Sequence, residues 1–352
     1  RQTDGSQRST DSGIWLLLAA EKIGVGMTIS EIAKLAGVSS AAVSRYLNDG
    51  SLSQEKRQRI ERVIRETKYR PSEYARTMRT KKSNRIGVLV PQIDSESVPK
   101  ILSGISERMD QKNYHVLLMN SNLSLEKEIG ILETFEQSQV DGLIFVASVL
   151  TKRHEKALEH MGVPVVILGQ KSEKYPCIYH DDEGAACAMM EELLKSGCRR
   201  PAYIGVDRRD KAAGENRYRG ACHALEKSGL HMDEVPYRVA AFSAQGGYQA
   251  MSEMLADGKR PDGVLCATDM IAAGVLSCLS ERGITVPGEM KVAGMGHGAI
   301  ADLLCPRLTT VHYHYHTSGR EAADLLLDLM EKKTRQQESR MLKYEVIRQK
   351  TI

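Results

Sequence analysis

Residues 27–48 read MTISEIAKLAGVSSAAVSRYLN and contain two short amphipathic segments separated by a glycine. We expect a first helix with an apolar stripe that consists of Ile29, Ile32, Ala33 and Leu35. Gly37 falls in the turn, where a residue without a Cβ atom adopts positive φ at no steric cost. Ser39 can cap the second helix, whose inner face would be Val43 and Leu47. The pattern predicts a helix-turn-helix unit.

The outward face of the second predicted helix consists of short side chains and one arginine, namely Ser40, Ala41, Ala42, Ser44 and Arg45. Short side chains let a helix approach base edges in the major groove, and an arginine can form a bidentate contact with guanine. We therefore expect this part of the chain to contact double-stranded DNA. The residues that we expect to do so are Ser39, Ser40, Ala41, Ser44, Arg45 and Asn48.

The charge of the chain is unevenly distributed along its 352 residues, although its net charge is only +4. Residues 27–84 contain 13 Lys and Arg against 6 Asp and Glu, whereas residues 85–352 contain 33 against 36. A basic head on a slightly acidic body is typical of a DNA-binding domain joined to a second module. The length also exceeds what one ordinary core accommodates, so we expect two or three domains.

From residue 85 onward, short apolar runs alternate with amphipathic stretches such as 98–112 and 124–137. The expected strands are 86–90, 115–119, 142–146, 165–168, 202–206, 264–267, 292–295 and 308–311. Alternation of this kind predicts parallel, doubly wound sheets with helices on both faces, and eight strands suffice for two such lobes. A ligand would bind at the carboxyl ends of the strands.

Several classes of protein are disfavoured by what the sequence lacks. Its seven cysteines have no close paired spacing, and no apolar run approaches the ~20 residues of a membrane span. No P-loop, G-x-S-x-G, H-E-x-x-H or calcium-loop signature occurs, so we expect no enzyme and no cofactor. His312, His314 and His316 alternate, which leaves a metal site as a less favoured alternative to hydrogen-bonding or dimer-contact roles. We expect a cytoplasmic protein.

The segment IAKLAGVSSAAVSRYLN resembles the beginning of lactose-repressor family regulators. The resemblance continues through Leu52-Ser53, a third helix over 55–67 and Tyr69-Arg70-Pro71-Ser72, and then covers essentially the whole remaining chain. It implies a DNA-binding domain over 27–72, a hinge helix and linker over 73–84, and an effector-binding and dimerisation body over 85–352. Residues 1–26 match nothing in the family, and we expect them to be a dispensable, disordered extension or translated upstream sequence that is not part of the fold.

For the body, the resemblance implies an N-lobe of about 85–183 and 313–335 and a C-lobe of about 184–311 plus the C-terminal strand. The chain would cross between them three times, near 182–185, 293–296 and 311–316. In the hinge, Met78 takes the place of the family's apolar wedge, which enters the central base step of the operator. Ala75 and Arg76 would contact DNA beside it, with Arg76 and Arg79 on phosphates. The alternative is an ordinary solvated linker.

The resemblance also implies ligand contacts in the cleft between the lobes. Arg217 matches the family arginine that binds ligand hydroxyls or carboxylates, and Asp269 matches an acceptor position. The loops after two N-lobe strands would contribute Gln92, Asp94, Ser95 and Gln170. Phe242 is a candidate stacking surface, as is Tyr248, although either ring could simply belong to the core. The family's ligand-binding aspartate is replaced here by Gly296, and we expect His297 to substitute for it.

Other stretches resemble trehalose-operon repressors, in which arginines bind a sugar phosphate. Gln92 and Gln170 appear at those places here, and two glutamines do not offset the charge of a buried phosphate dianion. We therefore expect a homodimeric repressor that a neutral disaccharide releases from its operator, with sucrose favoured. The alternatives are a sensor of trehalose or trehalose 6-phosphate, a corepressor-dependent regulator, and a sugar-binding protein without DNA function.

Overall fold

The computed structural model describes residues 27–69, 82–331 and 338–352, which form two units, Arg1–Ser83 and Asn84–Ile352. The expected extension over 1–26 and the hinge residues Ala75, Arg76 and Met78 lie outside the described residues. No helix in the described part of the chain is both long and apolar enough to cross a bilayer.

The head consists of three helices, namely α2 (Ile29–Ala36), α3 (Ser40–Leu47) and α4 (Gln54–Thr67). A capping box starts α2, because Glu31 N donates to Thr28 Oγ1 (3.3 Å) and Thr28 N donates to Glu31 Oε2 (2.6 Å). Gly37 ends α2 at φ 63°, as the sequence predicts. Ser39 Oγ caps α3 by accepting from Ala42 N at 3.3 Å.

The core of the head differs in detail from the predicted one. Its buried apolar side chains are Ile32, Ala33, Ala36, Ala42, Val43, Ile60 and Tyr69. The prediction that Ala42 faces outward is wrong, because Ala42 is only 3% exposed. Ile29 and Leu35 are half-buried at the edge of the stripe. A helix turns by about 100° per residue, so Ala42 and its neighbour Val43 both reach the core of this small unit.

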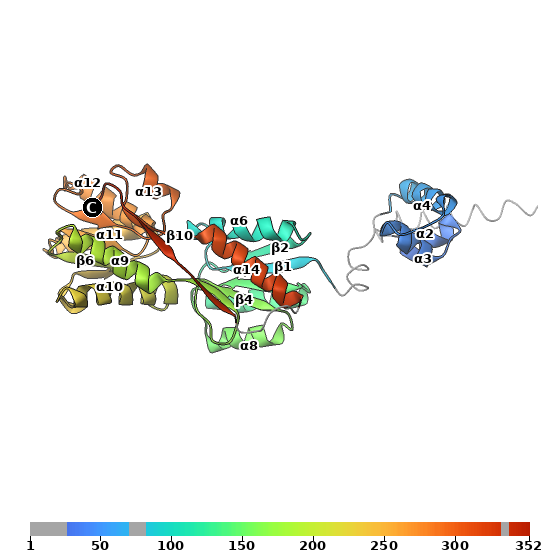
Figure 1. Cartoon of the computed structure of the whole chain (residues 1–352), viewed down its shortest axis with the longest axis horizontal. Coiled ribbons are helices and arrows are strands. Elements are labelled where there is room, and N and C mark those ends of the chain that lie inside the picture. Colours follow the sequence, from blue (N-terminus) through green and yellow to red (C-terminus); the bar gives the residue numbers. More distant parts are fainter. Residues whose placement is uncertain (1–26, 70–81, 332–337) are drawn as a thin grey trace, which may run out of the picture. The chain divides into compact units, whose positions relative to one another are not determined.

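The body contains two parallel sheets (Figure 1). The N-lobe sheet has the order β11-β5-β4-β3-β1-β2, and its strands are β1 (Arg85–Val90), β2 (His115–Asn120), β3 (Gly142–Val146), β4 (Val165–Leu168), β5 (Cys177–His180) and β11 (Ser339–Leu342). The C-lobe sheet has the order β7-β6-β8-β9, with β6 (Pro201–Gly205), β7 (Tyr237–Val239), β8 (Gly263–Cys266) and β9 (Lys291–Ala293). The expected pair of doubly wound lobes is confirmed.

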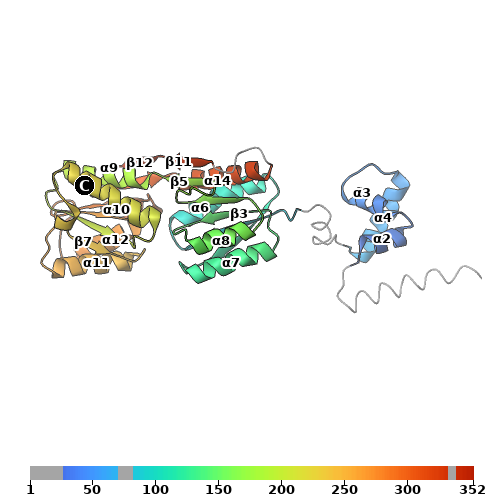
Figure 2. The same ribbon diagram turned by 90° about the horizontal axis from the view of Figure 1, so that it is seen from below.

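Helices cover both faces of each sheet (Figure 2). In the N-lobe, one face carries α6 (Ser97–Asp110) and α14 (Tyr315–Met330), and the other carries α7 (Leu125–Gln137) and α8 (Lys152–His160). In the C-lobe, the paired helices are α9 (Asp182–Lys195) with α10 (Arg217–Lys227), and α11 (Ala244–Ala256) with α12 (Asp269–Glu281). Short segments complete this lobe, namely a π-helix (Lys211–Asn216), a 3-10 helix (Met232–Glu234) and α13 (Ala299–Leu303).

Two of the expected lobe crossings agree with the structure, and one does not. The chain passes between the lobes from β5 to α9 and again from β10 (Thr310–Tyr313) to α14. The crossing expected near 293–296 is wrong: Gly294 N and Gly296 N donate to Thr309 O and Val311 O within the C-lobe, where the following α13 also packs. The third crossing runs from β11 to β12 (Tyr344–Ile347), which pairs antiparallel with β10.

The C-terminal stretch therefore forms two strands, whereas the sequence analysis expected one that belongs to the C-lobe. The first of them, β11, extends the N-lobe sheet by pairing with β5, in the register Ser339↔Cys177. Beyond β12, the chain reaches the C-lobe, because Val292 N donates to Thr351 O. The carboxyl ends of strands from both lobes face each other between these crossings, and this is the place where a ligand site is expected.

Candidate functional site

The predicted DNA-contacting residues of the head lie on and around α3. Ser39, Ser40, Ala41, Arg45 and Asn48 are exposed, and Ser44 is half-buried. Ser40 and Ser44, and likewise Ala41 and Arg45, are four residues apart and so share a side of the helix. Asn48 ends α3, and its Nδ2 donates to Ser44 O at 2.5 Å. The exposed side of α3 thus has short side chains and one long cationic side chain, that of Arg45.

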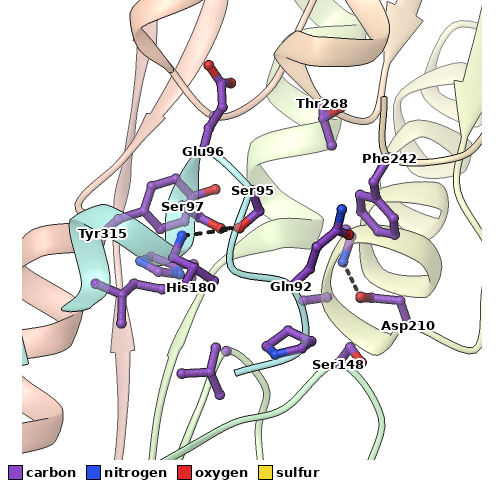
Figure 3. A pocket seen from close by; sticks show the side chains of 18 of the residues that line it. Gln92, Ser95, Glu96, Ser97, Ser148, His180, Asp210, Phe242, Thr268 and Tyr315 are labelled. Atoms are coloured by element: carbon purple, nitrogen blue, oxygen red, sulfur yellow. Dashed lines mark hydrogen bonds between the residues drawn. The ribbon is translucent and has the colours of Figure 1, made fainter. Parts of the chain in front are cut away.

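The body has a cavity of about 370 Å³ between the two lobes, and this cavity is open to solvent. Its wall is made of loops at the carboxyl ends of β1, β3 and β4, the end of β5, and segments of the C-lobe that include the π-helix. Figure 3 shows Tyr315 and His180 close together, with Gln92, Phe242 and Asp210 grouped across the cavity from them. Five of the eight predicted ligand residues line it, namely Gln92, Asp94, Ser95, Arg217 and Phe242.

Gln170 does not line the cavity, although its neighbour Gly169 does. The Gln170 side chain is only 5% exposed, and its Nε2 has no hydrogen-bond partner in the described part of the chain. Tyr248 also lies elsewhere, since its hydroxyl donates to Glu281 Oε2 at 2.6 Å on the surface of the C-lobe. Gln92 lines the cavity and Gln170 is buried outside it, so the two glutamines do not lie in the same site.

Asp269 supports the cavity wall from behind. It is 0% exposed, and its two carboxylate oxygens accept from Gly298 N at 2.8 Å and from Thr310 Oγ1 at 2.5 Å. Burial raises the pKa of Asp269 to about 6, and these two hydrogen bonds oppose that rise. Its sequence neighbours Thr268 and Met270 line the cavity. Asp269 therefore connects the loop that follows β9 with strand β10. Its carboxylate is not at the cavity wall.

His297 also lies outside the cavity wall, so in this structure it does not replace the missing aspartate. Its Nδ1 lies 3.2 Å from His312 Nδ1, and its Nε2 lies 3.4 Å from Asp302 Oδ2. Its carbonyl oxygen accepts from Lys100 Nζ of the N-lobe at 2.9 Å. The preceding Gly296 does line the cavity, at φ 143°, a backbone conformation that favours glycine.

Two of the three alternating histidines have acidic partners. His314 Nε2 lies 3.6 Å from Glu345 Oε1, and His316 Nε2 lies 3.1 Å from Glu107 Oε2. The ring of His312 contacts both His297 and His314, with ring centroids 5.2 and 4.9 Å apart. No group of three or more His, Cys, Asp or Glu in the described residues is placed to bind a metal ion.

Arg217 forms the buried polar centre of the site. It is 6% exposed, its Nε donates to Asp182 Oδ1 at 2.8 Å, and a terminal nitrogen donates to Ala267 O at 2.5 Å. Its guanidinium also lies 4.9 Å from the ring centroid of Tyr313. The pair joins the beginning of α9 to the beginning of α10, and both residues line the cavity. The rigid fork of donors is thus held in place at the wall.

Sequence reasoning missed a further set of polar lining residues, which are Ser148, His180, Asp182, Asp210, Ser243, Thr268 and Tyr315. Glu96 and Ser97 also line the cavity, and they belong to the loop after the first N-lobe strand, which was expected at the ligand. His180 and Asp182 were missed because the short strand β5, with the sequence CIYH, includes a polar residue and is followed by charged residues, so it has no clear apolar run. Asp210 caps the π-helix by accepting from Ala213 N at 2.8 Å, and burial raises its pKa to about 6. An acidic residue directly before K-A-A-G is a helix-start signal that could have indicated it.

The ionisable residues of the cavity wall are mostly acidic. Four carboxyl groups line it, those of Asp94, Glu96, Asp182 and Asp210, and Arg217 is the single Lys or Arg among the lining residues. His180 adds no positive charge at neutral pH, because burial lowers its pKa to about 4. With Arg217 paired to Asp182, the wall has no surplus positive charge for an anionic ligand.

A model of bacterial regulatory proteins of the lacI family matches residues 28–72, and a model of the periplasmic binding protein-like domain matches residues 190–352. A sucrose operon repressor of Staphylococcus xylosus is 32% identical over 324 residues, which are 92% of this chain and 96% of that protein. Catabolite control protein A of Priestia megaterium is 28% identical over 88% of this chain and 94% of its own length.

Solved structures show the same architecture. A lac repressor dimer bound to operator and the anti-inducer ONPF superposes with a TM-score of 0.83 at 24% identity, over 93% of this chain and 99% of that chain. The transcription regulator CcpA of Lactococcus lactis superposes with a TM-score of 0.70 at 28% identity, over 76% of this chain and 98% of that chain. The names of these proteins include an operon repressor and a transcription regulator, as the resemblance predicts.

Proposed function

Because the chain belongs to the lacI family of bacterial regulatory proteins, we propose that it represses a sugar-utilisation operon and leaves its operator when a neutral disaccharide binds in the cavity. Sucrose is the first candidate. The head would bind operator DNA through Ser39, Ser40, Ala41, Ser44, Arg45 and Asn48, with Ala75, Arg76 and Met78 of the hinge in the minor groove. Two copies would pair as a homodimer, so that two heads read two half-sites.

The charge of the cavity wall carries the choice of a neutral sugar. A phosphate dianion would face Asp94, Glu96 and Asp210 with no unpaired cation to offset it, and burial of such an uncompensated charge is costly. Hydroxyl groups suit the wall better, because they donate to carboxylates and accept from a guanidinium. Gln92 lines the cavity and also favours a neutral ligand, because an amide carries no charge to offset a phosphate. Gln170 does not contribute, because it is not at the wall.

The shape and polarity of the cavity also support a small polar ligand. Its volume lies near the lower end of the roughly 300–1,000 Å³ that is typical of small-molecule sites. Phe242 offers an aromatic face and Gln92 an amide, as in sites where the apolar face of a sugar ring packs on an aromatic side chain. The 32% identity with a sucrose operon repressor supports the choice of sucrose as the first candidate, ahead of trehalose.

The proposed mechanism couples the cavity to the head through lobe closure. A sugar that contacts Arg217 and Phe242 of the C-lobe together with Gln92 and Ser95 of the N-lobe stabilises the closed arrangement of the lobes. Closure would shift the dimer contact of the N-lobes, separate the hinge segments and lower operator affinity. Coupling of this kind typically amounts to about 1–3 kcal/mol.

The test begins with the full chain and a duplex selected for binding from a randomised palindromic library. Fluorescence anisotropy then gives operator affinity with sucrose, trehalose and trehalose 6-phosphate, each at saturating concentration. We expect sucrose to weaken operator binding and trehalose 6-phosphate to have no effect. The control variant Arg45→Ala should lose operator binding while isothermal titration calorimetry shows unchanged sugar binding.

Two outcomes would contradict parts of the proposal. Tighter operator binding in the presence of a sugar would replace induction by corepression. Release by trehalose 6-phosphate alone would refute the argument from the charge of the wall, since that ligand carries the phosphate that Asp94, Glu96 and Asp210 disfavour.

A further inference from the structure

His180 is the last residue of β5 and lies at the first crossing between the lobes, two residues before Asp182. Its side chain lines the cavity, although the residue is only 6% exposed. Neither the predicted ligand set nor the resemblance assigns it a role. It is therefore a buried, titratable residue at the cavity wall.

One nitrogen of the His180 ring lacks the hydrogen bond that a buried imidazole nitrogen normally makes. Its Nε2 is shielded from solvent and has no hydrogen-bond partner among residues 27–69, 82–331 and 338–352. A buried polar atom that stays unpaired costs about 1–3 kcal/mol, so a ligand group that pairs with this nitrogen would remove that cost. The neighbours of the ring are aromatic: its centroid lies 5.2 Å from that of Tyr313 and 5.3 Å from that of Tyr315.

The charge state of His180 limits what it can bind. Burial lowers its pKa to about 4, and Arg217, His314 and His312 contribute in the same direction, whereas Asp182 opposes them. Toward the ring, β10 presents Tyr313 and His312, α14 and its cap present Tyr315 and His314, α9 presents Asp182 and α10 presents Arg217. A neutral imidazole has one donor and one acceptor nitrogen.

We propose that His180 binds a hydroxyl group of the effector and is the N-lobe counterpart of Arg217. A hydroxyl both donates and accepts, so it pairs with either nitrogen of a neutral imidazole. A carboxylate or phosphate would need the donor nitrogen and would bring negative charge close to Asp182, which lines the same wall. The χ2 torsion of histidine is broad, so a modest rotation turns the ring edge toward a bound ligand.

This assignment rests on the proposed function and gives it a geometric consequence. Arg217 belongs to α10 of the C-lobe and His180 to β5 of the N-lobe. A polyhydroxyl ligand that contacts both residues bridges the lobes next to the point where the chain crosses between them. Such a ligand favours a particular arrangement of the lobes, which is the property that an effector requires.

The test replaces His180 with phenylalanine, which keeps a flat aromatic ring between Tyr313 and Tyr315 but removes both ring nitrogens. Isothermal titration calorimetry with sucrose should show at least about tenfold weaker binding to His180→Phe than to the wild-type chain, the effect of one lost hydrogen bond in a buried site. Operator affinity without sugar should be unchanged. Tyr179→Phe is the matched control, because adjacent strand residues point to opposite faces of the sheet.

Further measurements separate this inference from loss of folding and from failure of the proposed function. His180→Asn, which restores a donor and an acceptor, should recover part of the sucrose affinity. In the wild-type chain, the ring nitrogen signals of His180 in a ¹⁵N spectrum should shift when sucrose is added.

Unchanged sucrose affinity in His180→Phe, or ring signals that do not respond to bound sucrose, would overturn the role of His180 and leave the proposed function intact. If the wild-type chain binds neither sucrose nor trehalose, both the proposed function and the role of His180 are overturned.

Discussion

At the scale of single residues, the ion pair of Arg217 and Asp182 combines two requirements of an effector site. Both side chains are almost fully buried, at 8% and 4% exposure, so neither charge is compensated by bulk water. The pairing fixes the guanidinium at the cavity wall and at the same time joins α9 to α10. Removal of one partner should therefore affect folding as well as sugar binding.

Asp182→Ala should lower the free energy of unfolding by about 3–5 kcal/mol, because it leaves the Arg217 charge buried and unpaired. Urea unfolding of the full chain measures this change. The matched control is Glu183→Ala, the next residue in α9, whose carboxylate forms an exposed pair with Arg219 at 3.1 Å. Exposed pairs contribute about 0–1 kcal/mol. Equal losses in the two variants would contradict the importance of the buried pair.

The buried His180 predicts a pH dependence of stability. Its pKa of about 4 in the folded state lies below the ordinary value of 6.5, so the folded state binds fewer protons than the unfolded state. The free energy of unfolding is therefore unaffected by the protonation of His180 above pH 6.5, and it decreases as the pH falls from 6.5 toward 4. For this residue alone, the loss at pH 5 is about 2 kcal/mol.

Comparison of wild type with His180→Phe isolates this effect. Asp210 and Asp269 act in the opposite direction, because their pKa values are raised to about 6 and folding is favoured by their protonation as the pH falls. Both proteins contain them, so their contribution cancels in the difference. Urea unfolding at pH 7 and pH 5 should show a smaller loss of stability in the variant, and equal losses would mean that His180 is not buried as a neutral ring.

Residue-level prediction from the sequence succeeded where a motif fixed the position. Arg217 was found through its place three residues before Gly220, and it lies at the cavity wall. Asp269 and His297 lie close in sequence to lining residues, but their side chains are directed to Thr310 and His312. A sequence pattern indicates which loop reaches the cavity, whereas the direction of a side chain within that loop depends on contacts with distant residues.

At the scale of secondary structure elements, the head depends on its helix caps, since α2 and α3 have eight residues each and are too short to be stable alone. Thr28→Ala removes the capping box of α2 without touching a predicted DNA contact. We expect the head to lose about 1 kcal/mol, so that hydrogen exchange of the Ile32 and Ala33 amides becomes about fivefold faster.

Ser30→Ala is the control for this prediction, because Ser30 is an exposed residue of the same helix without a capping hydrogen bond. It should leave the exchange rates nearly unchanged. Identical acceleration in both variants would show that the capping box does not limit the stability of α2.

The hinge can be tested although Met78 lies outside the described residues. If Met78 acts as an apolar wedge in the minor groove, Met78→Gly should weaken operator binding and leave sucrose affinity nearly intact. Met78→Leu, which keeps an apolar wedge, should bind the operator almost as well as wild type. Fluorescence anisotropy with the selected duplex measures both variants, and unchanged affinity in Met78→Gly would remove the wedge from the account.

Strands with an uninterrupted run of aliphatic or aromatic residues were predicted well, and short strands that contain polar residues were not. The expected strands over 142–146 and 165–168 coincide with β3 and β4, whose residues are all buried. β5, β7 and β11 have the sequences CIYH, YRV and SRML, in which polar residues leave no such run. The π-helix was not predicted either, because the sequence K-A-A-G-E-N does not distinguish it from the α-helix that follows.

At the scale of the whole molecule, we propose that the cavity and the DNA-binding head are energetically linked. The cavity is well placed for this role, because residues of both lobes line it and the chain crosses between the lobes at β5–α9, β10–α14 and β11–β12. The two lobes were predicted from the sequence, but the crossing expected near 293–296 was wrong. A crossing is defined by which sheet a strand joins, and that depends on pairing between residues far apart in the chain.

The central claim is tested most directly by measuring the linkage in both directions. Operator affinity is determined with and without saturating sucrose, and sucrose affinity is determined with and without saturating operator, in one buffer and with the full chain. Linkage requires the same factor in both measurements, and we predict mutual weakening of roughly 5- to 150-fold. If sucrose binds and leaves operator affinity unchanged, the cavity is not coupled to the head and the account is contradicted.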